Sequence, residues 1–125
     1  MIYGIGIDIV KVSRFTNWYN TPGILERYFH KKEIAYIYSK DKESALQSLA
    51  ARFAAKEAFG KALGTGLFGF NLNEVSVVGY QNERPELQLY GKAQKLLIEL
   101  GIGRVHLSLS HEKEYSIAQV LLEKT

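Results

Sequence analysis

The feature that most constrains the fold is a long alanine-rich segment, residues 49–66, which reads LAARFAAKEAFGKALGTG. Alanine supplies six of its residues, leucine, lysine, arginine and glutamate supply six more, and there is no proline. These residue types have high helix propensity. The segment therefore predicts a long helix that ends at residues 64–66, because glycine readily adopts the left-handed conformation that closes helices.

Four residues of this segment recur at intervals of four: Leu49, Phe53, Glu57 and Lys61. This spacing predicts one stripe along the helix, with its apolar members toward the core. A charge on the apolar side of a helix costs several kcal/mol, roughly, unless it is paired or bound to a metal. Glu57 is therefore a candidate functional residue. The alternative is an ordinary surface pair between Glu57 and Lys61, which stabilises a helix by about 0.2–0.5 kcal/mol.

The N-terminal residues 2–10 are rich in isoleucine and predict a buried strand. On a strand, Gly4, Gly6 and Asp8 share one face, so two glycines leave that face bare just before a carboxylate. Asp8 is therefore a second candidate. The alternative is that Asp8 caps a following helix, although Ser13 offers a competing cap for a helical segment that extends to about Tyr19.

The remaining pattern predicts alternating short helices and strands. Helices are expected at 24–29, 32–38 and 91–100, with a turn at 21–23 and a polar loop at 39–44. Strands are expected at 74–80 and 86–90, joined by a hairpin turn at 81–85, and at 104–110 and 115–122. In the third of these strands Val105, Leu107 and Leu109 alternate with polar residues.

Composition narrows the class of protein. A chain of 125 residues predicts a single domain, residues 1–125, and the absence of cysteine excludes disulfides and thiolate metal sites. We expect a cytoplasmic protein, since the sequence has neither a signal-peptide pattern nor the ~20-residue apolar run of a membrane span. Residues 1–63 contain ten Lys and Arg against six Asp and Glu. This excess favours an acidic partner, which is either a protein or nucleic acid.

The charged candidates point to a hard metal ion. Asp8 and Glu57 supply oxygen ligands, and the sequence has neither cysteine nor a His-x-x-x-His pair, so magnesium is favoured over zinc. Magnesium typically completes its shell with water and phosphate oxygens, which suits a diphosphate substrate. The residues alone leave two other classes open, a magnesium-dependent phosphohydrolase of a free nucleotide and a small basic nucleic-acid-binding module.

Three motifs resemble a known family over essentially the whole chain. Residues 52–59 and 61–66 read RFAAKEAF and KALGTG, residues 4–8 read GIGID, and residues 105–111 read VHLSLSH. Their order and spacing resemble the holo-acyl-carrier-protein synthases, the short bacterial 4′-phosphopantetheinyl transferases. The chain departs from the family pattern at Gly60, where serine is frequent, and at Glu112, where threonine is common.

The resemblance implies an α+β fold in which a small antiparallel sheet packs against a long central helix. It implies transfer of 4′-phosphopantetheine from coenzyme A to a serine of apo-acyl carrier protein, in support of fatty acid biosynthesis. Adenosine 3′,5′-bisphosphate is the second product. Family members of this type form homotrimers with sites at subunit interfaces, so nucleic acid and membranes are not the expected partners.

The resemblance also assigns roles to residues. Asp8 and Glu57 are expected to hold Mg²⁺, with Glu57 as the base for the serine proton, directly or through water, and Lys61 as the catalytic cation. The residues expected at coenzyme A are Arg52, Lys61, Gly64, Gly66 and His111. The residues expected at the acidic carrier protein are Arg14 and Arg27.

Overall fold

The structure is a computed structural model and describes residues 1–79 and 84–125. Its elements in chain order are β1 (Ile2–Lys11), η1 (Val12–Phe15), α1 (Thr16–Asn20), α2 (Ile24–Tyr28), α3 (Lys31–Tyr38), α4 (Lys42–Leu63), η2 (Leu72–Glu74), β2 (Val75–Val78), β3 (Glu86–Leu89), α5 (Gly91–Leu100), β4 (Ile102–His111) and β5 (Tyr115–Lys124). No helix among these described residues is long and apolar enough to cross a membrane.

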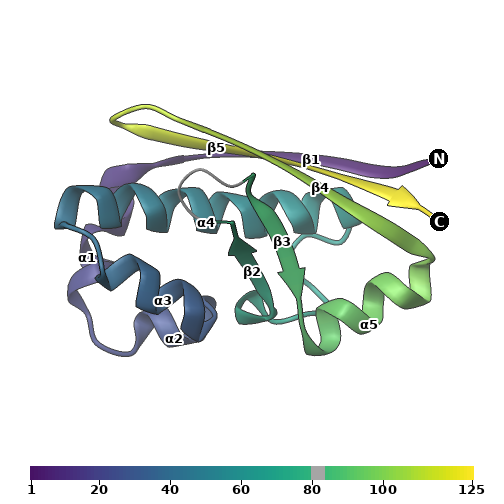
Figure 1. Ribbon diagram of the computed structural model, residues 1–125, viewed down its shortest axis with the longest axis horizontal. Coiled ribbons are helices and arrows are strands. Elements are labelled where there is room, and N and C mark those ends of the chain that lie inside the picture. Colours follow the sequence, from purple (N-terminus) through teal and green to yellow (C-terminus); the bar gives the residue numbers. More distant parts are fainter. Residues whose placement is uncertain (80–83) are drawn as a thin grey trace.

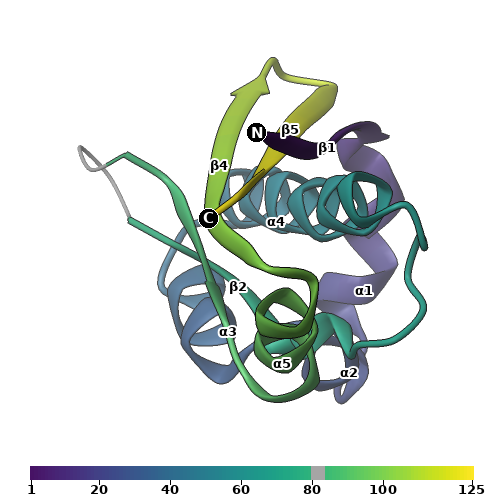
Figure 2. The same ribbon diagram turned by 90° about the vertical axis from the view of Figure 1, so that its right-hand side faces the viewer.

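A three-stranded antiparallel sheet lies along one side of α4. Its strand order is β1-β5-β4, and β2 and β3 form a separate antiparallel pair. The short helices α1–α3 lie on the other side of α4 (Figures 1 and 2). The two termini lie at the same end of the sheet, where the Lys124 amide donates to the Met1 carbonyl at 2.8 Å. The predicted α+β class, with a small antiparallel sheet packed against a long central helix, is confirmed.

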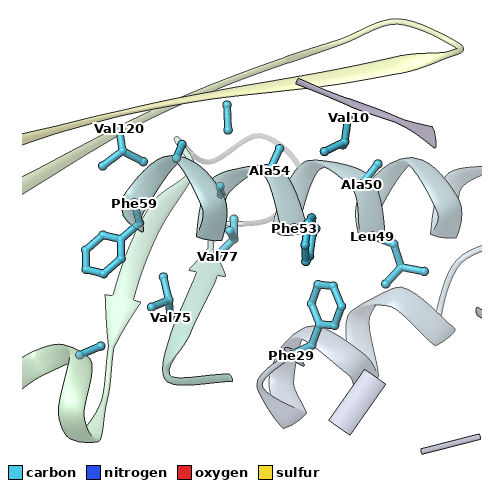
Figure 3. Packing of buried hydrophobic residues seen from close by; sticks show 14 of the residues in the cluster. Val10, Phe29, Leu49, Ala50, Phe53, Ala54, Phe59, Val75, Val77 and Val120 are labelled. Atoms are coloured by element: carbon cyan, nitrogen blue, oxygen red, sulfur yellow. The ribbon is translucent and has the colours of Figure 1, made fainter. Parts of the chain in front are cut away.

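Helix α4 supplies the middle of the core. Small residues, including Ala50 and Ala54, face Val10 and Val120 of the sheet, while Phe53 points toward the short helices (Figure 3). Alanine lets the sheet approach the helix closely, and a helix that is buried on most sides needs such small residues. The helix ends as predicted at Gly64, whose φ is 85°.

The start of α4 differs from the prediction. The polar residues 42–44, expected in a loop, form its first turn. Asp41 occupies the N-cap position and Glu43 lies in the first turn. Both placements suit a helix start, since acidic groups are favourable near the positive end of the helix dipole. A polar segment of this kind is typical of a loop and of a helix N-terminus alike.

The stripe predicted along α4 turns gradually away from the core. Leu49 and Phe53 are buried, Glu57 is half-buried, and the Lys61 side chain is 51% exposed. An α-helix has 3.6 residues per turn, so each step of four residues advances about 40° beyond a full turn. The charged end of the stripe therefore reaches the edge of the contact with β1.

Strand β1 is buried on one face. A methyl group added at Gly4 or Gly6 would lie 2.0 Å from the carbonyl oxygen of Ala62 or Ala58, so the backbone of α4 fills the space beside both glycines. The isoleucines of the opposite face, Ile5, Ile7 and Ile9, are 57–59% exposed. The prediction of a buried strand therefore holds for one face only, because within residues 1–79 and 84–125 the isoleucines of the other face stay exposed.

The other predicted elements are largely confirmed. Helices α2, α3 and α5 and strands β3, β4 and β5 lie within two residues of their predicted bounds. The segment expected to run as one helix to Tyr19 is instead split into η1 and α1, and Ser13 does not cap it. Strand β2 ends at Val78, and most of the predicted hairpin turn falls on residues outside the described ranges.

We expect Gly6→Ala to destabilise the protein by about 3 kcal/mol, the upper part of the usual range for overpacking, because the obstructing atoms belong to the helix backbone. Gly103→Ala is the matched control on a strand, since its methyl group would meet the terminal Thr125 side chain, which can rotate away. It should cost less than about 1 kcal/mol. Urea unfolding of both variants measures the difference, and equal costs would contradict the tight packing at Gly6.

Candidate functional site

The first group of site residues lies where β1 packs on α4. Asp8 follows the glycines on the same face of β1, and the glycine contacts bring this face against the second half of α4. The Lys61 ammonium lies 3.1 Å from Oδ1 of Asp8 and donates to the Ile7 carbonyl at 3.0 Å. One lysine of α4 therefore joins the helix to β1.

Glu57 belongs to the same group. Burial raises the pKa of Glu57, and the nearby Asp8 carboxylate raises it further. Lys61 and Arg14 act in the opposite direction on this pKa, so both cations also lie within electrostatic reach. The Arg14 guanidinium is centred 5.1 Å from the Phe53 ring, one turn of α4 before Glu57. Two carboxylates and two cations thus gather around one side of α4.

The structure adds a partner to the first alternative, the surface pair of Glu57 and Lys61, and contradicts the second, the helix cap at Asp8. Lys61 forms a salt bridge with Asp8 on β1, so it connects the helix to the strand in addition to lying near Glu57. Asp8 lies inside β1, and the following η1 begins after Lys11, without a side-chain cap. Both charged residues therefore act in the contact between the strand and the helix.

The donor set fits magnesium. Within residues 1–79 and 84–125, no group of three or more His, Cys, Asp or Glu side chains could hold a metal ion by itself. Asp8 and Glu57 are two carboxylates whose mutual repulsion contributes to the raised pKa of Glu57. A divalent cation between them would relieve that repulsion. Magnesium accepts one or two carboxylates if phosphate oxygens and water supply the remaining ligands.

A second group surrounds a pocket of about 410 Å³ between α3, α4 and β4. The polar and charged residues that line it are Tyr36, Lys40, Ser44, Gln47, Ser48, Arg52 and His111. None of the described lining residues is acidic. The pocket is therefore suited to an anionic group, and both Arg52 and His111 line it, whereas Lys61, Gly64 and Gly66 do not.

Arg52 is held in place from several sides. Its side chain is 7% exposed, and its Nη1 donates to Ser48 Oγ at 2.5 Å. The guanidinium lies 4.7 Å from the centre of the Tyr36 ring, and Lys40 lies 4.9 Å from the same ring. Its Nε is 3.8 Å from a carboxylate oxygen of the buried Glu33. The position of this cation is thus fixed by its surroundings.

The two groups lie at opposite edges of the sheet. Asp8 is on β1 and His111 is on β4, with β5 between these strands, which separates their backbones by about 10 Å. Ser48 and Glu57 are nine residues apart on α4, which is two and a half turns, so they point to roughly opposite sides. One chain therefore presents two separate half-sites.

Three other predicted residues lie near one group or outside both. Gly64 and Gly66 have φ values of 85° and 64° and follow α4 just beyond Lys61. A side chain added at either would meet no atom within 4 Å, so both leave the backbone accessible. Arg27 is exposed on α2 and lines neither group.

The sequence analysis did not identify several residues that lie in or beside these groups. Tyr36, Lys40 and Ser48 lie in the pocket, and Glu33 and Lys56 form a buried ion pair beside Arg52. The burial of Lys56 could have been predicted from the sequence, because it lies seven residues after Leu49 and therefore on the buried side of the helix. The pairing of Glu33 with Lys56 spans 23 residues and depends on how α3 packs, which no local pattern specifies.

Comparisons with known proteins identify the family of this chain. Residues 4–120 match the model of the 4′-phosphopantetheinyl transferase superfamily. The chain is 52% identical over 123 residues to the holo-[acyl-carrier-protein] synthase of Treponema denticola, covering 98% of this chain and 99% of the relative. This chain belongs to the 4′-phosphopantetheinyl transferase superfamily.

Solved structures place it with the same enzymes. The holo-[acyl-carrier-protein] synthase of Neisseria meningitidis matches with a TM-score of 0.88 and 37% identity, covering 99% of this chain and 100% of that one. A holo-(acyl-carrier-protein) synthase from Bacillus anthracis, solved in complex with CoA (3′,5′-ADP), matches with a TM-score of 0.84 and 32% identity over 100% of this chain and 99% of that one. The resemblance found in the sequence motifs is confirmed.

We expect Glu57→Gln to leave the metal-free protein at least as stable as wild type at pH 7. A raised pKa means that folding favours the protonated carboxyl, so stability falls as the pH rises above the ordinary pKa of glutamate and Glu57 ionises. The advantage of the glutamine variant should therefore disappear near pH 4. Thermal melts in chelating buffer at both pH values measure this.

Glu43→Gln is the control on the same helix. Glu43 is exposed in the first turn of α4, where a negative charge is favourable, so this change should cost about 0.3–1 kcal/mol at pH 7. A lower melting temperature of Glu57→Gln at pH 7 would instead make ionised Glu57 a stabilising partner in the fold.

Proposed function

We propose that this protein transfers the 4′-phosphopantetheine group from coenzyme A to a serine of apo-acyl carrier protein, as a holo-[acyl-carrier-protein] synthase. The observation that carries the proposal is the meeting of Asp8, Glu57 and Lys61 at the contact between β1 and α4. The family membership of residues 4–120 supports it. The products are holo-acyl carrier protein and adenosine 3′,5′-bisphosphate, and the process served is fatty acid biosynthesis.

Asp8 and Glu57 would hold Mg²⁺ together with the pyrophosphate of coenzyme A. When bound, the ion supplies charge stabilisation for the phosphoryl group and its leaving oxygen. The two carboxylates on one side of α4 support this role. The raised pKa of Glu57 shows that its ionised form is disfavoured in the metal-free site, and a bound cation would stabilise that form.

Glu57 is the proposed acceptor of the proton from the carrier serine, directly or through a water molecule. The serine oxygen forms a bond to the phosphorus that carries the pantetheine arm, and the bond from that phosphorus to the bridging oxygen of adenosine bisphosphate breaks. Proton acceptance by a carboxylate positioned at the serine is general base catalysis. Lys61 would place its ammonium on a phosphate oxygen, where its charge favours the developing negative charge.

The second half-site would bind the distal part of coenzyme A. The pocket beside Arg52 and His111 combines cations with a volume of about 410 Å³, which suits a phosphorylated nucleoside end. Gly64 and Gly66 would let the ligand approach the backbone after α4.

A complete site requires two copies of the chain in this proposal. The half-sites of one chain lie at opposite edges of its sheet, and the outer face of β1 exposes three isoleucines, Ile5, Ile7 and Ile9. Exposed apolar faces of this kind are typical of interfaces between subunits. We therefore propose that Asp8 and Glu57 of one subunit face Arg52 and His111 of its neighbour, and the family resemblance implies that the assembly is a homotrimer.

Arg14 and Arg27 would bind the acidic carrier protein. Both are exposed and lie on the N-terminal helical segments. Arg14 also acts on the pKa of Glu57, so it stands where a carrier serine would have to approach. A cytoplasmic location and a single domain remain predictions.

Mass spectrometry of apo-acyl carrier protein tests the function. Incubation with this protein, coenzyme A and Mg²⁺ should add one phosphopantetheine to the carrier and release adenosine 3′,5′-bisphosphate, and chelation should stop the reaction. Release of free phosphate without any change in carrier mass would identify a phosphohydrolase. Tight binding of single-stranded nucleic acid without a product would identify a binding module.

Lys61→Ala should lower kcat about 10²–10³-fold, as the loss of one electrostatic group in an active site typically does. Its salt bridge to Asp8 is half exposed, so the free energy of unfolding should change by less than about 1 kcal/mol. Lys61→Arg should recover part of the activity, because a planar guanidinium cannot reproduce a compact ammonium. Steady-state kinetics and thermal melts decide the matter, and near-normal turnover in Lys61→Ala would remove this lysine from the mechanism.

Arg27→Glu should raise the KM for the carrier protein about three- to tenfold and leave the KM for coenzyme A unchanged. The effect should shrink as salt is added, because exposed charges are screened over ~10 Å at 0.1 M ionic strength. Lys95→Glu, an exposed reversal on α5, is the control of equal charge change and should have no effect. Arg14→Glu should disturb both substrates, since Arg14 lies near Glu57. If Arg27→Glu and Lys95→Glu behave alike, Arg27 does not bind the carrier.

A further inference from the structure

The pocket of the second half-site contains a lysine in addition to the expected Arg52 and His111. Lys40 lies between α3 and α4 and lines the pocket together with Ser44, Ser48 and Arg52. These four residues recur at intervals of four, and the last three lie along one side of α4. Lys40 therefore extends the wall that Arg52 forms and adds a second basic side chain to it.

The ammonium of Lys40 lies close to Arg52, at an aromatic ring that both contact. Lys40 Nζ is 4.9 Å and the Arg52 guanidinium is 4.7 Å from the centre of the Tyr36 ring. Lys40 is half-buried, and the flexible four-carbon stem of lysine lets its ammonium move at the pocket wall. A phosphate group that lies beside this ring is therefore within reach of Lys40.

Lys40 has no salt bridge among residues 1–79 and 84–125. The pKa of the exposed Asp41 is lowered by Ser44 and, to a smaller extent, by Lys40, so this neighbouring carboxylate lies within electrostatic reach but beyond salt-bridge distance. A lysine ammonium has three N–H donors. Within this part of the chain, those of Lys40 are available to a ligand.

The charge of a phosphate monoester suits a wall with two cations. Such a group carries about 1.5 to 2 negative charges at pH 7. Arg52 Nε already lies 3.8 Å from a carboxylate oxygen of Glu33, so Arg52 shares its charge with a protein partner. Arg52 and Lys40 together compensate a bound monoester better than Arg52 alone.

The chemistry of coenzyme A identifies which phosphate group this is. In the proposed function, its pyrophosphate lies with Mg²⁺ at Asp8 and Glu57 of one subunit. The group left for the pocket of the neighbouring subunit is the phosphate monoester on the 3′ carbon of the ribose. We infer that Lys40 binds this monoester and thereby makes the protein select coenzyme A over dephospho-coenzyme A, which lacks it. The inference rests on the proposed function and makes Lys40 a specificity-determining residue.

Steady-state kinetics of carrier modification with two donor substrates test the inference. Coenzyme A and dephospho-coenzyme A share the pantetheine arm and the pyrophosphate, and they differ only in the monoester. Lys40→Met should lower kcat/KM for coenzyme A roughly tenfold, the scale of one lost hydrogen bond between charged groups, and leave kcat/KM for dephospho-coenzyme A unchanged. An equal loss with both donors would mean that Lys40 only supports the pocket wall, and would overturn the inference.

Lys42→Met is the matched control. Lys42 is exposed two residues further along the chain and is not among the described residues that line the pocket. This change should alter neither value, and a loss of preference as large as in Lys40→Met would overturn the inference by making the effect one of net charge. Lys40→Arg keeps a cation at the wall and should retain most of the preference for coenzyme A.

Isothermal titration calorimetry separates this inference from the proposed function, because it requires neither carrier protein nor turnover. The wild-type protein should bind adenosine 3′,5′-bisphosphate roughly tenfold more tightly than adenosine 5′-monophosphate, and Lys40→Met should bind both alike. Failure of the wild-type protein to modify apo-acyl carrier protein would refute the proposed function, whereas a preference that depends on Lys40 would still support this inference. Equal binding of the two nucleotides by the wild-type protein would overturn the inference even if the carrier is modified.

Discussion

The close approach of β1 to α4 is the contact on which the rest of the structure depends. The carbonyl oxygens of Ala58 and Ala62 occupy the space that side chains at Gly6 and Gly4 would fill. This contact sets the distance between the sheet and the helix, and it brings Asp8 and the Ile7 carbonyl within hydrogen-bonding distance of Lys61. A larger residue at either glycine would lift the strand and separate the charged groups of the first half-site.

The sequence predicted which residues lie at this contact, but it did not predict that the backbone of α4 packs directly on the two glycines. The two-residue period of a strand correctly placed Gly4, Gly6 and Asp8 on one face, and the helix pattern correctly carried the apolar stripe to Glu57 and Lys61. The pattern predicts a bare strand face beside Asp8, whereas in the structure the helix backbone fills the space beside both glycines. A glycine in a strand is compatible with close approach of either a ligand or another backbone, and sequence alone does not distinguish the two.

The arrangement of the two half-sites lay beyond the sequence for a different reason. Arg52 and Glu57 are close in the chain, and both were expected to act on one ligand. The order β1-β5-β4 separates Asp8 from His111, and this order follows from long-range pairing that local patterns do not encode. The same limit applies to Glu33, whose partners come from α4 and β2 and whose position next to two lysines in the sequence resembles that of a surface residue.

Helix α4 links the two half-sites through consecutive residues. Lys56 points into a buried cluster with Glu33 and Arg52, whereas Glu57, the next residue, faces Asp8 on the other side. Successive residues of a helix are about 100° apart around its axis, so neighbouring residues within one turn can face the buried cluster and the first half-site. The three acceptors of Lys56 fix the rotation of the helix about its axis. Its Nζ reaches α3 through Glu33, and it also reaches the Leu72 carbonyl in η2 and the Val75 carbonyl at the start of β2. The glycine contacts fix the same helix from the sheet side. With both constraints present, Glu57 has one direction in which to point, and Arg52 lies on the side of the helix that faces the pocket.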